Sequence, residues 1–171
     1  MFSRIAFALL LLTGNVILLS AQTVAELDRR NGFKSIKLGS TIDSVKGAVV
    51  KKEFLEKEEF PTQLYETENA EYKTIGEVAV RKIQLMTYKK LIYKIVVTTE
   101  KDPRLMRALE KSFGKAVYVL RTTSYSWKAE KVSLTFLAHK NDLELTYRCY
   151  PVYKMMLEDK GKKVDVMAED F

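Results

Sequence analysis

The sequence predicts an α+β domain in which an antiparallel sheet of about five to seven strands packs against one main helix. Several stretches in the second half of the chain alternate apolar and polar residues, which is typical of half-buried strands. One stretch, at about 103–113, instead repeats apolar residues every three or four positions, as an amphipathic helix does. A short helix at about 41–48 completes the expected elements.

The main helix carries signals at both ends. Asp102 is a suitable N-cap, and Pro103 follows at the first helical position, where its missing N–H is not needed. Gly114 is the expected C-terminal glycine. The apolar stripe between them consists of Leu105, Met106, Leu109 and Phe113. A stripe of this kind is typical of core packing rather than of a cofactor site.

The short helix at about 41–48 rests on a cap. Ser40 is followed three residues later by Asp43, which resembles a capping box, and Gly47 weakens or ends the helix. The alternative is that Gly39-Ser40-Thr41 binds an anion. Phosphate-binding loops usually have more than one glycine and often a lysine, so the sequence favours helix initiation.

The strand pattern begins after the polar, charged region that ends near Lys73. Strand parity changes at Arg81–Lys82, which predicts a bulge, and Tyr88 to Leu91 forms the next turn. No internal repeat is visible. The segment 51–60 is charge-rich, and 65–73 is expected to be a loop or an edge strand. The expected strands are 78–87, 92–99, 117–123, 125–128, 132–137 and 143–150.

Three regions divide the chain. Residues 1–21 have the layout of a secretory signal peptide, with Arg4 before an apolar stretch and the small pair Ser20-Ala21 at its end. An uncleaved anchor is the alternative. Residues 22–155 are expected to form the single α+β domain, and 156–171 a charged, partly disordered tail.

Charge and localisation follow from this division. Removing 1–21 takes away Arg4 and no acidic residue, which lowers the formal charge from +7 to +6. A basic exported protein, in the periplasm or secreted, meets anionic surfaces and acidic partners. Nucleic acid is not expected, because export argues against it and the lysine pairs are scattered. These pairs are Lys51-Lys52, Lys89-Lys90 and Lys162-Lys163.

The residue types that carry catalysis or metal binding are sparse. Cys149 is the single cysteine, so no internal disulfide forms. His139, the single histidine, is expected at an exposed turn, whereas strand parity places Cys149 inward. The glutamates of 53–59 are interleaved with lysines, which favours a solvated face over a metal site. The sequence therefore predicts no catalytic residue, cofactor or metal, although a hydrolase of unrecognised type is not ruled out.

Aromatic residues give a different signal. The chain has nine tyrosines and one tryptophan, many of them in or beside expected strands. Tyrosine favours strands for structural reasons, but it is also enriched at interfaces. The expected partner contacts are Tyr88, Tyr93, Tyr125 and Trp127.

A further resemblance rests on short stretches of the chain. These are "GFKSIKLGSTIDSVKG", "LMTYKKLIYKIVVTT", "LMRALEKSFGKA", "SYSWKAEKVSLTF" and "DLELTY". Together they resemble small exported α+β proteins of Bacteroidota-type bacteria over most of 31–150, a resemblance that implies structure and no particular activity. "LGSTIDSV" also resembles the opening of outer-membrane-assembly lipoproteins of the BamE type. Those carry a lipid-modified cysteine near the start, and no cysteine stands there in this sequence.

The sequence thus favours a non-catalytic binding or adaptor protein that contacts an envelope protein partner. One alternative is a small-ligand carrier, which requires an enclosed cavity between sheet and helix lined by Leu109, Phe113 and Phe136. The hydrolase alternative requires two polar groups that converge in one cleft.

Overall fold

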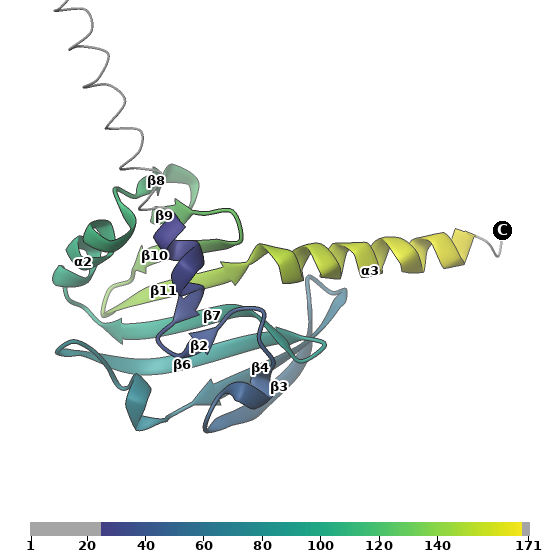
Figure 1. The fold of residues 1–171 in the computed structure, drawn as a ribbon, viewed down its shortest axis with the longest axis horizontal. Coiled ribbons are helices and arrows are strands. Elements are labelled where there is room, and N and C mark those ends of the chain that lie inside the picture. The colour runs from purple at the N-terminus through teal and green to yellow at the C-terminus, as the bar shows by residue number, and fades with distance from the viewer. Residues whose placement is uncertain (1–24, 169–171) are drawn as a thin grey trace, which may run out of the picture.

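Antiparallel strands dominate the structure, a computed structural model that describes residues 25–168 (Figure 1). The α+β class is confirmed, with a nine-stranded main sheet where five to seven strands were expected. The signal peptide expected at 1–21 lies outside the described residues. The strands of the main sheet are β3 (Ala48–Glu56), β4 (Phe60–Thr67), β5 (Thr74–Ile75), β6 (Val78–Tyr88), β7 (Leu91–Glu100), β8 (Val117–Val119), β9 (Ser124–Lys128), β10 (Val132–Ala138) and β11 (Asp142–Cys149).

The other elements are short, apart from two helices. Residues 25–30 are helical and lead into a small hairpin of β1 (Gly32–Phe33) and β2 (Ile36–Lys37). Single 3-10 turns occur at η1 (Ile42–Ser44), η2 (Ala70–Tyr72) and η3 (Leu120–Thr122). The two helices are α2 (Arg104–Phe113) and α3 (Tyr150–Ala168).

The order of the strands divides the main sheet into two similar halves. It runs β3-β4-β6-β7-β11-β10-β9-β8, with β5 paired to β6. Each half is a meander of four strands, and the last strands of the two halves, β7 and β11, pair from Glu100–Asp142 to Lys94–Arg148. The topology thus has a two-fold pattern, although the sequence shows no internal repeat.

Helix α2 confirms the main helix expected at 103–113. The Asp102 carboxylate accepts a 2.7 Å hydrogen bond from the Arg104 backbone N–H, as an N-cap does. At the other end, the Gly114 N–H donates to the Glu110 carbonyl, and Gly114 has a φ of 80°, which glycine adopts without strain.

The helix expected at 41–48 is shorter than predicted, because the chain makes one 3-10 turn at Ile42–Ser44 and enters β3 at Ala48. Pairing with the β6–β7 hairpin competes with helix formation here. The Gly39 N–H donates to the Ile92 carbonyl, and the Ile42 N–H donates to the Lys90 carbonyl. These donors are used within the protein, so Gly39-Ser40-Thr41 does not present them to an anion.

The charge-rich segment 51–60 lies in the β3–β4 hairpin, and the segment 65–73, expected to be a loop or an edge strand, contains the end of β4 and the turn η2. Strand β3 pairs only with β4 among the described strands, so most of its side chains are exposed and the apolar alternation is weak. The bulge expected near Arg81–Lys82 is confirmed by a register shift between Val80 and Lys82. The strand expected at 117–123 is shorter, since η3 follows β8.

Helix α3 includes residues 156–168 of the charged tail expected at 156–171. Val152 and Met156 are buried, and the Asp159 carboxylate accepts hydrogen bonds from Lys89 and Tyr88. The helix contacts the tips of the β3–β4 and β6–β7 hairpins through Lys57 and Lys89, and beyond residue 160 it extends away from the sheet (Figure 1). Within residues 25–168 no helix is both long and apolar enough to cross a membrane.

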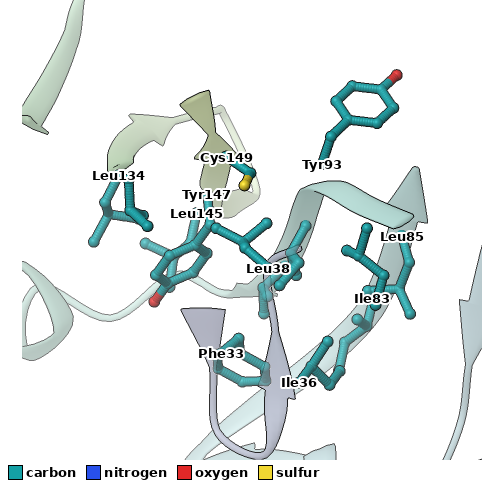
Figure 2. Packing of buried hydrophobic residues seen from close by; sticks show 14 of the residues in the cluster. Phe33, Ile36, Leu38, Ile83, Leu85, Tyr93, Leu134, Leu145, Tyr147 and Cys149 are labelled. Carbon is teal, nitrogen blue, oxygen red and sulfur yellow. The ribbon is translucent and has the colours of Figure 1, made fainter. Parts of the chain in front are cut away.

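One face of the sheet, here called the covered face, holds the core. Leu145 and Tyr147 lie on it together with their cross-strand partners Val97 and Ile95. The β1–β2 hairpin packs over these residues through Phe33 (Figure 2). Helix α2 packs over the same face, with the Phe113 ring 6.5 Å from that of Trp127. Cys149 has the parity of Leu145 and Tyr147 and is buried, which confirms its expected inward position.

Candidate functional site

The four aromatic residues expected to contact a partner do not share one accessible surface. Tyr88, Tyr93 and Trp127 are buried, and each uses its polar atom inside the protein. The acceptors are Asp159 for the Tyr88 hydroxyl, Glu56 for the Tyr93 hydroxyl and the Gly114 carbonyl for the Trp127 Nε1.

Tyr125 is the exception, because 39% of it is exposed beside Tyr118, with the two ring centroids 5.1 Å apart. The rings of Tyr88, Tyr93 and Trp127 therefore serve mainly to fill the core. Residue type alone did not distinguish this role from partner contact.

The other face of the sheet, here called the open face, presents polar and charged side chains, with Glu144 and Glu66 among the basic residues. In an antiparallel pair, residues directly opposite each other point to the same side. The pairs Lys94–Arg148, Arg148–Ser133 and Ser133–Lys128 therefore form one row across β7, β11, β10 and β9. Along each strand, the residues of this row are neighbours of residues that point to the covered face, as Arg148 is of Tyr147 on β11.

The cations of the open face are only partly neutralised. Arg148 and Lys128 are exposed and form no ion pair with any residue of 25–168. Lys94 lies 3.4 Å from Glu56, and Lys82 lies 2.7 Å from Glu66. The hydrogen bond from Lys82 lowers the pKa of the Glu66 carboxyl, more than partial burial raises it. The sequence did not reveal this row, because its members lie on separate strands.

A small pocket of about 210 Å³ lies where strands β7 and β11 meet the start of α3. The tip of the β3–β4 hairpin reaches α3 there, and Lys57 donates a hydrogen bond to the Tyr153 hydroxyl. Figure 2 shows the Tyr93 ring pointing away from the other labelled core residues. The lining residues are Glu56, Tyr93, Arg148, Cys149, Tyr150 and Tyr153.

His139 and Cys149 do not form a catalytic dyad. His139 follows β10 at the β10–β11 turn, where its Nε2 lies 3.7 Å from a Glu144 carboxylate oxygen. Cys149 pairs with Val132 at the opposite end of β10, about 20 Å away at the usual rise of a strand. No three metal-ligating side chains of His, Cys, Asp or Glu cluster in the described part of the chain.

The Cys149 thiol is expected to react slowly with iodoacetamide in the folded protein at neutral pH. It is buried, and burial raises the pKa of the thiol, so little thiolate is present to react. Labelling followed by mass spectrometry should show rapid modification after unfolding in urea. Rapid, stoichiometric modification of the folded protein would contradict the buried position.

Two separate hollows border α2, where the ligand-carrier alternative requires one enclosed cavity. A hollow of about 360 Å³ reaches Leu109 and Phe113, on the side of α2 that faces the β1–β2 hairpin. A groove of about 870 Å³ reaches Phe136 and runs beside Met106. Neither contains all three residues named for that cavity, and both open to solvent.

Comparison of the chain with known proteins found no relative. A scan against protein-family models found no match, and searches of curated proteins and of solved structures found none either.

Proposed function

We propose that the protein is an exported, non-catalytic binding protein that docks through its open face onto an acidic surface of an envelope protein. The observation that carries this proposal is the row of Lys94, Arg148 and Lys128, two of which lack an acidic partner among the described residues. Exposed cations attract and orient an oppositely charged surface, and they add more to encounter rate and specificity than to affinity.

The shape of the open face supports a protein partner. Between the long basic side chains lie small polar residues, Ser126, Ser133 and Thr146, which are buried by their neighbours. A broad surface of this composition fits the polar character of non-obligate interfaces. The periplasm or the cell exterior is the proposed location, since the first 21 residues have the layout of a signal peptide.

The test is an in-cell cross-linking pull-down of the tagged protein from the envelope fraction, read by mass spectrometry. One stoichiometric protein partner is expected. The double variant Arg148→Glu, Lys128→Glu should lower its recovery about tenfold, which corresponds to about 1.4 kcal/mol.

The matched control is Lys111→Glu with Lys115→Glu, which makes the same charge change at exposed positions in and just after α2. This control should recover the partner as the unaltered protein does. Equal losses in both double variants, or no partner above background with the unaltered protein, would refute the proposed surface.

A further inference from the structure

The hollow between α2 and the β1–β2 hairpin has the composition of a ligand site. Its volume of about 360 Å³ falls in the range of small-molecule pockets, which are mostly apolar with a few placed polar groups. Its apolar wall includes side chains from α2, from β1 and from the covered face of the sheet. These are Phe33, Leu105, Leu109, Phe113 and Leu145.

A tyrosine hydroxyl that has no protein partner but is accessible from the hollow lines this site. Tyr147 is 5% exposed, yet its hydroxyl has no hydrogen-bond partner among residues 25–168. Figure 2 shows its ring extending from β11 on the side of the sheet that Phe33 covers. Burial raises the pKa of this phenol, so it stays protonated and remains a donor. This donor is free to bind an acceptor group of a ligand in the hollow.

The rim of the hollow is basic. Arg30, Lys34 and Lys37 line it, and no aspartate or glutamate does. Both lysines donate to backbone carbonyls, of Glu71 and Arg30, rather than to carboxylates. Arg30 uses its Nε for Glu26 and stacks over the Phe113 ring at 5.3 Å. Its two terminal nitrogens donate to no residue of the described chain.

We infer that this hollow binds a small amphiphilic carboxylic acid. The carboxylate accepts hydrogen bonds from the Tyr147 hydroxyl and the Arg30 guanidinium, and the apolar body lies among Leu105, Leu109 and Phe113. Charge-assisted hydrogen bonds of this type are the strong ones, and burial of the apolar body adds to the affinity. The site lies on the covered face, so it is independent of the partner surface proposed above.

The experiment is a calorimetric titration of the protein with decanoate, compared with decanol and decylammonium, which carry chains of the same length. Saturable binding of one decanoate per chain is expected, with decanol at least about tenfold weaker. Tyr147→Phe and Arg30→Gln should each weaken decanoate binding by about tenfold or more, the effect of losing a hydrogen bond to a charged group.

Control variants, a stability measurement and hydrogen exchange separate an effect on binding from an effect on folding. Tyr125→Phe and Arg29→Gln change exposed residues of the same types, and both should bind decanoate unchanged. Without ligand, Tyr147→Phe should retain its thermal stability, because it removes a donor that has no partner. Decanoate should also slow hydrogen exchange of the backbone amides of 105–113 in the unaltered protein.

Several results would overturn the site. These are the absence of saturable binding to the unaltered protein, equal affinity for decanol, or affinities that Tyr147→Phe and Arg30→Gln leave unchanged. If Tyr147→Phe did not fold, Arg30→Gln would decide alone, because half of the Arg30 side chain is exposed. The double variant Arg148→Glu, Lys128→Glu should still bind decanoate, which distinguishes failure of this site from failure of the partner surface.

Discussion

Replacing Leu145 by alanine is expected to destabilise the protein by about 3 kcal/mol, within the range for a buried leucine. Leu145 is 1% exposed and lies on β11, between Val97 of β7 and Phe136 of β10. The substitution leaves a cavity at the centre of the covered face, which close-packed neighbours fill only in part. The measurement is unfolding in urea at constant pH, with the midpoint and slope fitted separately.

The matched control for Leu145 is Leu137→Ala. Leu137 is half-buried on β10 and pairs with Glu144, so it belongs to the open face. Its loss should cost less than about 1 kcal/mol, because truncation of a half-buried side chain that solvent reaches leaves no closed cavity. Equal losses at the two positions would mean that the covered face does not hold the core.

Replacing Asp28 by alanine is expected to cost about 2–4 kcal/mol, a large effect for a residue at the protein surface. Its carboxylate accepts three backbone hydrogen bonds, from Glu130 at 2.9 Å and from Lys131 and Val132 at 3.0 Å each. These N–H groups belong to the β9–β10 turn and lose their acceptor in the variant. Thermal unfolding measures the loss, and hydrogen exchange should accelerate at the amides of 130–132.

Asp43→Ala is the control for this loss of charge. The Asp43 side chain is 72% exposed and lies 3.9 Å from the Lys90 ammonium, an arrangement that contributes little. A change within about 0.5 kcal/mol is expected. If Asp28→Ala changed stability as little as Asp43→Ala does, the three hydrogen bonds would not be stabilising the turn.

The sequence predicted those elements whose faces differ in polarity. Helix α2 and strands β6, β7, β10 and β11 each direct most of their large apolar residues to one side, so these residues follow the period of the element. Strand β3 lacks this contrast because both of its faces are largely exposed. The length of helix α3 could not be predicted, because its contacts are with two hairpin tips that are distant in the sequence.

Contacts between distant segments also limited the prediction of function. Tyr88 and Trp127 are of the types that interfaces favour, but Asp159 and the Gly114 carbonyl satisfy them within the fold. The open-face row and the hollow beside α2 each collect residues from several strands or helices. Strand register brings Arg148 and Lys128 into one row, and the β1–β2 hairpin brings Arg30 near Tyr147. Neither arrangement has a local signature in the sequence.

The two-fold order of the main sheet has a consequence for how the chain assembles. Within each half, strands that pair in the main sheet follow one another closely in the chain, so hairpins of low loop-closure cost build both halves. The β7–β11 pairing is different, since residues 101–141 separate its strands. Joining the halves therefore carries the largest entropic cost among the sheet pairings, and long-range pairings of this kind form slowly. In a chain that emerges N-terminus first, the meander β3–β7 can form before β8–β11 exist. Until β11 pairs with it, β7 is a temporary edge strand.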